Sequence, residues 1–318
     1  MSQQGLEAAL CKMREAGVDG SAIGVFSHYY RLLESGETGL IREESIEPLL
    51  DPPMLDDVEV SDSEARDAIG ATVIIKLNGG LGTSMGLDKA KNLLEVRDGL
   101  NFLDLIVRQV RAARCNWDAP LPLLFMNSFR TEADTLAHLE RYPDLPVDDL
   151  PLSFLQNQEP KLRADDLTPV EWPKDPSLEW CPPGHGDLYT ALWGQSLLQR
   201  LIEKGFRYAC ISNGDNLGAA PNARLAGWFA SSGAPYAAEL CRRTVNDRKG
   251  GHLAIRKHDG QLILRDTAQT ASEEMGYFTD EHRHPFFHTN NLWFDLQRLT
   301  DTIRERDAVL GLPMIRNE

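Results

Sequence analysis

Cysteine is scarce in this sequence, and long apolar runs are missing. The five cysteines are odd in number, widely spaced and without a C-x-x-C pair: Cys11, Cys115, Cys181, Cys210 and Cys241. This distribution fits reduced thiols in a cytosol better than a disulfide framework or a zinc site. Residues 1–17 carry charges among their apolar positions, so they lack a signal-peptide core, and no run approaches the length of a membrane span. We therefore expect a cytoplasmic protein.

Basic residues are also in deficit. The chain has 33 Lys and Arg against 48 Asp and Glu, which gives a formal net charge of −15 at pH 7. This balance speaks against nucleic acid or an anionic membrane as the main partner. It does not exclude a small anionic substrate, because a few lysines can dominate one cleft. The 318 residues, 42% of them hydrophobic, are enough to bury a sizeable core.

The first part of the chain differs from the rest. Residues 6–16 and 22–33 have the pattern of two short amphipathic helices. Residues 44–67 are rich in acid and contain three prolines, so we interpret them as a linker or a wrapping arm. We accordingly divide the chain into an N-terminal helical segment and linker, 1–65, and a main domain, 66–318.

Apolar runs and helical patterns alternate through the first part of the main domain. The expected strands are 72–77, 121–126, 152–156 and 208–212, and the expected helices are 101–113, 131–142 and 188–203. Asn101 is placed to cap its helix, with Asp104 in the first turn. The alternation predicts an α/β fold with a largely parallel central sheet.

Strand signals dominate after Gly233. Residues 236–241 and 253–256 have the pattern of strands, and Asp259-Gly260 is a strong signal for a hairpin turn. A last helix is expected over 296–306. The sequence thus predicts an α/β core with an added antiparallel β element.

A glycine-rich loop follows the first buried strand, over Lys76 to Gly86. Its sequence, K-L-N-G-G-L-G-T-S-M-G, lets backbone N–H groups approach an anion closely. A Walker A loop needs G-x-x-x-x-G-K-S/T, which does not occur, and a dinucleotide fingerprint G-x-G-x-x-G is missed by one residue. A nucleotidyltransferase loop, with Lys89 or Lys91 neutralising phosphate, stays open beside two plainer alternatives. These are a tight turn that serves packing only and ordinary surface lysines.

Taken with further segments, this loop resembles the UTP–glucose-1-phosphate uridylyltransferase (UDP-glucose pyrophosphorylase) family of the eukaryotic type. The resemblance covers residues 70 to about 295, with the segments in the family's order. Besides Lys76 to Gly86, the matching segments are Asn101 to Leu105, Met126 to Phe129, Pro182 to Tyr189, Ser212 to Ala219, Lys249 to Gly251 and Thr289 to Trp293. The implied fold is a Rossmann-like, GT-A-like nucleotidyltransferase with a mixed sheet flanked by helices.

The resemblance also implies a site. Nucleotide-binding positions would be Leu77, Asn78, Gly79, Gly80, Gly82, Thr83, Gln158, Gly184 and His185. Sugar-binding positions would be Asn213, Gly251, Asp266 and Asn290, with Lys91 and Lys89 as the catalytic cations and Asp215 as the ligand of Mg²⁺. From the residues alone, plainer roles stay open: Gln158 as a loop residue, His185 with Asp187 as a helix cap, and Asp215 as a turn residue.

The implied reaction joins UTP and glucose 1-phosphate. A phosphate oxygen of glucose 1-phosphate would attack the α-phosphorus of UTP, and pyrophosphate would leave. The nucleophile is already an anion, so catalysis would be positioning and charge neutralisation. Two alternatives remain: a UTP-dependent pyrophosphorylase for another sugar 1-phosphate, and a UDP-sugar-binding fragment without turnover. An NAD-dependent dehydrogenase fits less well because of the loop spacing and the absence of an acidic residue at the end of a second strand.

The sequence departs from the family pattern at several positions. Lys89-Ala90 stands where the family has Gly-Pro, Gly214 replaces a bulky apolar residue, Asp266 replaces a glutamate and His288 replaces another polar residue. The family continues into a second phosphate-binding lysine and a C-terminal β-helix, so we expect either a fragment of a longer protein or a chain of reduced activity. The oligomeric state is not indicated.

Overall fold

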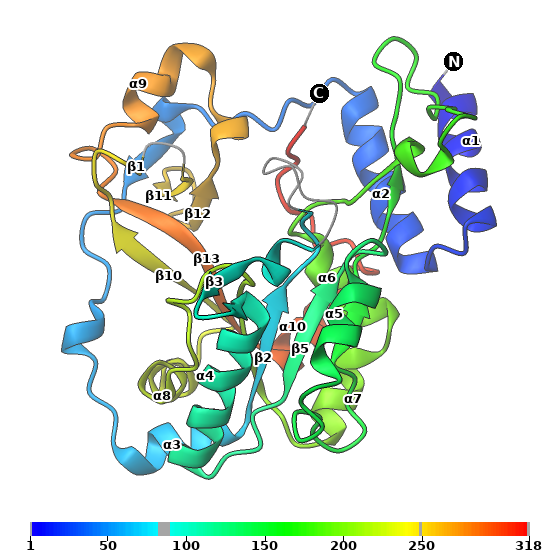
Figure 1. Cartoon of the computed structure of the whole chain (residues 1–318). Coiled ribbons are helices and arrows are strands. Elements are labelled where there is room, and N and C mark those ends of the chain that lie inside the picture. Colours follow the sequence, from blue (N-terminus) through cyan, green and yellow to red (C-terminus); the bar gives the residue numbers. More distant parts are fainter. Residues whose placement is uncertain (1, 82–89, 248–249, 317–318) are drawn as a thin grey trace.

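A mixed β-sheet runs through the centre of the molecule. The computed structural model describes residues 2–81, 90–247 and 250–316 (Figure 1). Within these ranges the main sheet has the order β1-β11-β13-β9-β2-β5-β6, with β10 beside β13 and β12 beside β11. Its strands are β1 (Ile46–Pro48), β2 (Thr72–Leu77), β5 (Leu123–Asn127), β6 (Ser153–Leu155), β9 (Tyr208–Asn213), β10 (Tyr236–Arg242), β11 (His252–Arg256), β12 (Leu262–Arg265) and β13 (Phe286–Asp295).

The parallel core expected from the sequence is present. β2 pairs in parallel with β5 and with β9, and β5 pairs in parallel with β6. β13 joins β9 antiparallel and carries β10 and β11, so the predicted antiparallel element is an extension of the same sheet. The Asp259-Gly260 turn lies between β11 and β12, and Gly260 takes the positive φ of 72° that the turn requires.

Helices cover both faces of the core because successive residues of each buried strand point to opposite faces. Ile74 packs with α3 (Asp62–Gly70), α4 (Phe102–Trp117) and α8 (Ala223–Ser232). Its neighbours Val73 and Ile75 pack on the other face with α6 (Asp187–Gly194), α7 (Leu197–Glu203) and α10 (Leu296–Glu305). α5 (Glu132–Leu139) lies beside β6 at the edge of the sheet (Figure 1).

The predicted cap of α4 is confirmed. Asn101 Oδ1 accepts a hydrogen bond from the backbone N–H of Asp104 at 2.9 Å, and the Asp104 carboxylate accepts one from the backbone N–H of Asn101 at 3.0 Å. This reciprocal capping box fixes where the helix begins. The helix continues to Trp117, beyond the Ala113 expected from the sequence.

The single helix predicted over 188–203 was wrong. The chain forms two helices, α6 and α7, with Ser196 between them at a φ of 56°. Gly194 lies directly against the N-terminal helices, since a Cβ there would come within 2.8 Å of a carboxylate oxygen of Asp19. The break between the two helices thus lies directly beside a contact with the N-terminal helices.

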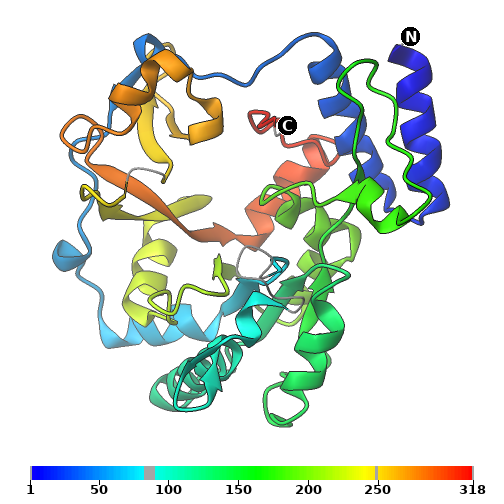
Figure 2. The same ribbon diagram turned by 45° about the horizontal axis from the view of Figure 1, so that its top comes forward.

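The N-terminal helices α1 (Ser2–Glu15) and α2 (Gly20–Glu34) form a small core of their own. Met13 and Tyr30 are buried between them and pack with Trp180, from the two-stranded sheet of β7 (Glu159–Pro160) and β8 (Trp180–Cys181). The Lys12 ammonium forms an ion pair with Glu179 from the segment joining those strands. Figures 1 and 2 place these helices on one side of the upper end of β2, and the lobe of β1, β11, β12 and α9 (Met275–Phe278) on the other.

The segment 44–67, expected to be a linker or a wrapping arm, contributes to the main fold. Ile46 to Pro48 form β1, which pairs with β11 at the edge of the main sheet. The segment then passes through a short 3₁₀ turn, Leu55–Asp57, to α3, which spans the domain boundary placed at residue 65. The arm is therefore built into the sheet.

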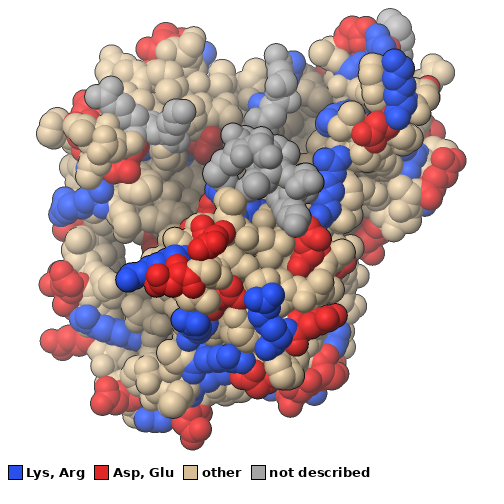
Figure 3. Space-filling model, viewed as in Figure 1, with Lys and Arg blue, Asp and Glu red and all other residues tan. Residues whose placement is uncertain are grey.

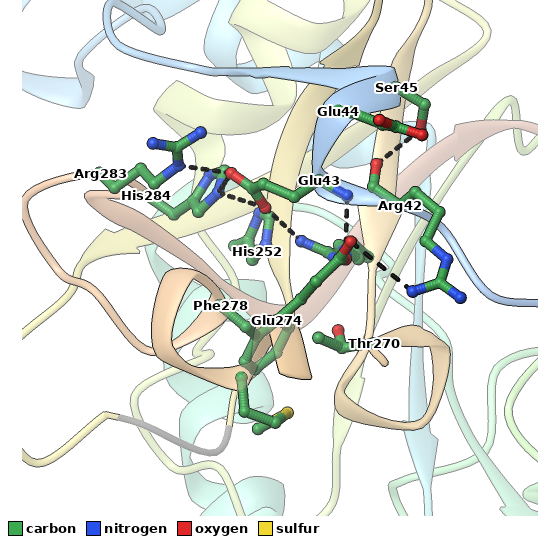
Figure 4. A network of polar contacts seen from close by, with 12 residues as sticks. Arg42, Glu43, Glu44, Ser45, His252, Thr270, Glu274, Phe278, Arg283 and His284 are labelled. Atoms are coloured by element: carbon green, nitrogen blue, oxygen red, sulfur yellow. Dashed lines mark hydrogen bonds and ion pairs between the residues drawn. The ribbon is translucent and has the colours of Figure 1, made fainter. Parts of the chain in front are cut away.

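A buried network around Glu43, the residue directly before this arm, joins the arm to the lobe of β11, β12 and α9 (Figure 4). The Glu43 carboxylate accepts hydrogen bonds from Arg265 at 2.5 Å and from Arg283, and Arg265 also donates to Glu274 at 2.5 Å. His284 Nε2 lies 3.1 Å from Glu43 Oε1, and the His284 ring stacks on the His252 ring at 3.7 Å between centroids. Arg265 is fully buried and Glu43 is 8% exposed at its side chain, so the network binds two distant parts of the chain in a region screened from water.

Charges of both signs are mixed over the face that carries α3, α4 and α5, as the lower part of Figure 3 shows. Every helix within the described ranges is too short or too polar to cross a lipid bilayer. All five cysteines are free thiols.

Candidate nucleotide-binding site

Two loops leave the sheet side by side. β2 and β9 are parallel neighbours with Leu77 opposite Asn213, so the glycine loop and the Asn213–Asp215 turn start at the same edge. The backbone N–H of Gly214 donates to the carbonyl of Leu77 at 2.9 Å and ties the two loops together. In open α/β sheets, ligands bind at the carboxyl ends of parallel strands. This edge is therefore where a site is expected.

Lys91 and Asp215 meet across this edge. Lys91 lies in the short helix η4 (Lys91–Leu93), and its ammonium forms an ion pair with the Asp215 carboxylate. The side chains are 41% and 32% exposed, so both groups can also reach a ligand. An ion pair as exposed as this one adds little to stability. The structure thus brings together the lysine and the aspartate for which the resemblance implies catalytic and metal-binding roles.

The two ends of the glycine loop lie side by side. Leu81 and Ala90 are paired in an antiparallel bridge, and the backbone N–H of Lys91 donates to the carbonyl of Gly80 at 3.2 Å. Lys91 is therefore held beside the strand from which the loop began. The predicted site residues Gly82, Thr83 and Lys89 lie outside the described residues.

The buried side chain of Asn78 anchors the start of the glycine loop. Its side-chain amide is buried, donates to Asn127 Oδ1 at 2.6 Å and to Thr135 Oγ1 at 2.8 Å, and accepts from Asn92 Nδ2 at 2.5 Å. All the polar atoms of this side chain are thus used within the protein. We infer that any ligand of the loop meets backbone groups around Asn78 rather than its amide.

Gly79 lies against a glutamine that the sequence analysis did not select. A Cβ on Gly79 would come within 2.6 Å of Gln156 Oε1, so the amide of Gln156 contacts the loop. Gln156 extends β6 at the same edge of the sheet, with its N–H donating to the carbonyl of Asn127 at 2.8 Å. The predicted Gln158 is half-buried two residues further on, and the described residues provide it with no hydrogen-bond partner. Gln156 was the last residue of the strand expected over 152–156, so its place beside the loop follows only from where β6 ends and how it pairs with β5.

Three predicted residues from separate segments meet beside the β9 turn. Asn290 Nδ2 donates to Asn213 Oδ1 at 2.8 Å and lies 3.2 Å from His185 Nδ1. Asn290 has a φ of 59°, within a break in the pairing of β10 with β13. Glu239 faces Asn291 but Leu240 faces His288, so Thr289 and Asn290 fall outside the strand register, although the Thr289 hydroxyl donates to the carbonyl of Glu239 at 2.8 Å. This bulge turns Asn290 out of the regular ladder, as bulges near functional sites often do.

Gly251 and Asp266 lie next to one another in the antiparallel lobe. A Cβ on Gly251 would come 3.0 Å from the carbonyl oxygen of Arg265 and 3.6 Å from Asp266 Cα. The carbonyl of Gly251 accepts a hydrogen bond from the N–H of His288 at 2.8 Å, which connects this pair to the Asn290 bulge. The Asp266 carboxylate accepts from the N–H of Ala268 at 3.0 Å and so caps the following 3₁₀ turn.

The two histidines beside Asn290 are neutral near pH 7. Burial lowers the pKa of His288 to about 4, with the nearby His185 ring acting in the same direction. Desolvation also lowers the pKa of His185, although the Asp266 carboxylate opposes this effect. The N–H of Asn290 donates to His288 Nδ1 at 3.3 Å, which a neutral imidazole can accept. Neutral imidazole and amide groups suit uncharged hydroxyl groups as ligands.

The segment before α6 has its own fixed geometry. Gly184 has a φ of 99°, which L side chains rarely adopt. Asp187 starts α6, but its carboxylate accepts hydrogen bonds from the N–H and Nδ2 of Asn157 at 2.6 and 2.7 Å. The alternative of a simple helix cap formed by His185 and Asp187 is therefore wrong, since the cap position of α6 has no side-chain hydrogen bond.

Lys76 is a buried cation beneath the β9 turn. Its ammonium donates to Ser212 Oγ at 2.7 Å and to the carbonyl of Ala219 at 2.8 Å, at the two ends of the turn that carries Asp215. The side chain is 1% exposed and no carboxylate within the described residues forms an ion pair with it, so burial lowers its pKa to about 8. Lys76 therefore holds the turn in place at a cost in desolvation.

This burial predicts a specific pH dependence. Unfolded Lys76 titrates near its ordinary pKa of about 10.4, so between pH 8 and that value the unfolded chain binds more protons than the folded one. Its contribution to stability therefore rises with pH across this window and is lowest below pH 8. The unfolding free energy of each protein is measured with urea at pH 7.5 and at pH 10, and the value at pH 7.5 is subtracted from the value at pH 10. This difference should be more positive for the unaltered chain than for Lys76→Met by roughly 1–3 kcal/mol. Equal changes in the two proteins would contradict this prediction.

The protein alone offers too few ligands for a divalent cation, so a bound nucleotide would have to supply further oxygen atoms. No group of three or more His, Cys, Asp or Glu side chains suited to a metal occurs in the described parts of the chain. Asp215 supplies one hard carboxylate. Mg²⁺ is commonly held by one or two carboxylates, substrate phosphates and water, so the donor set fits Mg²⁺ bound together with a nucleotide.

The fold and the two loops define the class of protein. A mixed sheet with a parallel centre, a glycine loop after β2 and a lysine–aspartate pair across the ends of β2 and β9 is the arrangement of a Rossmann-like nucleotidyltransferase. Residues 24–318 match the family model of UTP–glucose-1-phosphate uridylyltransferase. The chain belongs to this family.

Individual relatives agree with this assignment. The UTP–glucose-1-phosphate uridylyltransferase of Solanum tuberosum is 36% identical over 248 residues, 78% of this chain and 51% of the relative. That of Saccharomyces cerevisiae is 39% identical over 246 residues, 77% of this chain and 48% of the relative. The chain thus spans about half the length of these curated relatives.

Solved structures extend the similarity to nearly the whole chain. UDP-glucose pyrophosphorylase from Leishmania major, known in open and closed structures, matches with a TM-score of 0.91 and 42% identity over 99% of this chain and 68% of that one. A structure from Trypanosoma brucei described as UDP-glucose phosphorylase matches with a TM-score of 0.91 and 40% identity over 99% of this chain and 67% of that one. One Leishmania structure is a complex with UDP-glucose.

Proposed function

We propose that this chain transfers a uridylyl group from UTP to glucose 1-phosphate and releases pyrophosphate, giving UDP-glucose. The observation that carries the proposal is the Lys91–Asp215 pair at the joined ends of β2 and β9, beside the glycine loop. Family membership supplies the reaction, and the complex of the Leishmania major relative with UDP-glucose supplies the product class. The reaction belongs to carbohydrate metabolism, and the free thiols support a cytoplasmic location.

The geometry suggests how the residues divide the work. Backbone groups of Leu77, Asn78, Gly79 and Gly80 would hold the triphosphate, with Gly184 and His185 on the nucleotide from the other side. Asn213, Gly251, Asp266 and Asn290 would bind the hexose. Lys91 would neutralise the charge that develops as the sugar phosphate oxygen bonds to the α-phosphorus and the bond to the pyrophosphate oxygen breaks. No proton is transferred, because the attacking phosphate oxygen is already an anion.

Mg²⁺ belongs to the same proposal. Asp215 would be its protein ligand, and the ion would supply neutralisation of phosphate charge when bound. The Asp215 carboxylate is already paired with Lys91, so this chain holds the lysine and the proposed metal ligand in contact before substrate enters.

The proposal is tested by incubating the purified chain with UTP, Mg²⁺ and a panel of sugar 1-phosphates and measuring pyrophosphate release. Release with glucose 1-phosphate well above that with galactose 1-phosphate or N-acetylglucosamine 1-phosphate is expected. Preference for another sugar would replace glucose in the proposal. Binding of UDP-glucose without any release of pyrophosphate would identify a binding fragment instead.

Asn290 gives a separate test of the sugar side. Replacing Asn290 by Ala removes the amide that joins Asn213 and His185. We expect KM for glucose 1-phosphate to rise about 2- to 10-fold, as loss of one hydrogen bond to a neutral hydroxyl costs roughly 0.5–1.5 kcal/mol, with KM for UTP nearly unchanged. Steady-state kinetics with each substrate varied in turn measures both values. An equal rise in both would remove Asn290 from the sugar side.

A further inference from the structure

Asn92 joins the two ends of the segment that forms the glycine loop. It directly follows Lys91, and its side chain is 3% exposed. Asn92 Nδ2 donates to Asn78 Oδ1 at 2.5 Å, and Asn78 is the first residue after β2. The position of Lys91 is thus fixed relative to the strand through its neighbour's amide, in addition to the backbone contact of Lys91 with Gly80.

The same amide also touches the loop that carries Asp215. A Cβ on Gly214 would come 1.9 Å from Asn92 Nδ2 and 3.0 Å from both Asn92 Cγ and the carbonyl oxygen of Leu77. Gly214 is not in the left-handed region, so glycine is required here for space and not for backbone conformation. Asn92 is held by its hydrogen bond to buried Asn78 and cannot turn aside without breaking it.

We propose that Asn92 and Gly214 are a size-matched pair that sets the position of Lys91 relative to Asp215. Each member directly adjoins one of the two charged residues in the sequence, and the Asn92 amide occupies the space that a side chain at position 214 would need. Both are positioning residues that act through their neighbours. The inference also accounts for a departure noted in the sequence: a bulky residue at position 214 is incompatible with an asparagine in the place that Asn92 occupies.

The kinetic consequence of this pair rests on the proposed function. The substitutions that test the pair follow from the geometry alone. Gly214→Ala places a methyl group where Asn92 Nδ2 lies, which displaces η4 and Lys91. Asn92→Ala removes both Nδ2 and Cγ, the two Asn92 atoms that this methyl group would meet, and leaves the carbonyl oxygen of Leu77 at 3.0 Å. Displacement of a catalytic group by about 1 Å can cost up to 10²-fold in rate, so we expect Gly214→Ala to lower kcat about 10–100-fold with smaller changes in KM. The double variant should recover part of this loss, because it relieves the overlap but lacks the hydrogen bond from Asn92 to Asn78.

The experiment measures kcat, KM for each substrate and the thermal midpoint for the unaltered chain, both single variants and the double variant. Gly70→Ala is the matched control, because a Cβ at Gly70, at the end of α3, meets no atom within 4 Å. Its kcat should stay unchanged. Multiplicative losses in the double variant, without recovery, would overturn the pairing. A lower thermal midpoint in Gly214→Ala with unchanged kcat would also overturn it, since the role would then be structural only.

Crystal structures of the unaltered chain, Gly214→Ala and the double variant separate this inference from the proposed function. We expect the Lys91–Asp215 contact to be lost in Gly214→Ala and restored in the double variant, whether or not the chain turns over substrate. If the unaltered chain releases no pyrophosphate but the contact follows this pattern, the proposed function fails and the pair stands. If the unaltered chain is active and the contact is intact in Gly214→Ala, the pair is refuted.

Discussion

Replacing Lys91 by alanine is expected to lower the rate of pyrophosphate release about 10²–10³-fold, the usual loss when one group stabilising a transition state is removed. The reason is geometric: Lys91 is the described lysine that meets Asp215 at the joined ends of β2 and β9. The thermal midpoint should change little, because the ion pair is more than a third exposed on the lysine side. Pyrophosphate release in a coupled assay and thermal unfolding give the two readouts.

Lys204→Ala is a suitable control for this variant. Lys204 also forms an exposed ion pair, with Asp149 at 2.6 Å, and is 37% exposed. It follows α7 and lies away from both loops. It should retain full activity. Unchanged turnover in Lys91→Ala would remove this lysine from the mechanism and leave Lys89 as the candidate cation.

Replacing Glu43 by alanine is expected to lower the free energy of unfolding by about 3–5 kcal/mol, the usual cost of removing one partner of a buried ion pair. The Glu43 carboxylate pairs with three basic side chains: Arg265, which is fully buried, Arg283 and His284 (Figure 4). Without its carboxylate, the Arg265 charge keeps Glu274 as its one ion-pair partner among the described residues. The urea midpoint should fall with little change in the m-value.

Glu44→Ala is the matched control for Glu43→Ala, because the neighbouring glutamate is exposed. Its unfolding free energy should stay within about 0.5 kcal/mol of the unaltered chain.

The effect of Glu43 should also depend on pH. Burial tends to raise its pKa, but hydrogen bonds from Arg283, His284 and Arg265 hold the net pKa below the ordinary value. Its contribution is then present at neutral pH and lost as pH falls through the folded pKa. A neutral result for Glu43→Ala would mean that the Glu43 carboxylate does not stabilise the fold.

Local patterns predicted the part of the fold that positions the site. The run Thr72–Leu77, the glycines after it and the run ending at Ser212 were sufficient to place the glycine loop and Asp215 on one edge of a parallel sheet, as observed. The cap at Asn101 was predictable for the same reason, since a capping box depends on residues three apart.

Features set by distant contacts could not be predicted in this way. The contact of Gly194 with Asp19 and the pairing of residues 46–48 with β11 both join segments that are far apart in the sequence. The place of Asn290 depends on a change of register between β10 and β13. Within the site, Gln156 lies against Gly79 because it continues the ladder of β6. Each of these features requires knowing which segments are neighbours in space.

β13 also has a mechanical consequence. β10 pairs with β13 on both sides of its bulge, from Phe286 to His288 and from Asn291 to Phe294. β10 therefore runs without interruption alongside the two displaced residues, Thr289 and Asn290, and the Thr289 hydroxyl donates to the carbonyl of Glu239 at 2.8 Å. The connection between the parallel core and the antiparallel lobe is thus two strands wide where Asn290 leaves the ladder. This second strand stiffens the backbone that presents the Asn290 amide to Asn213.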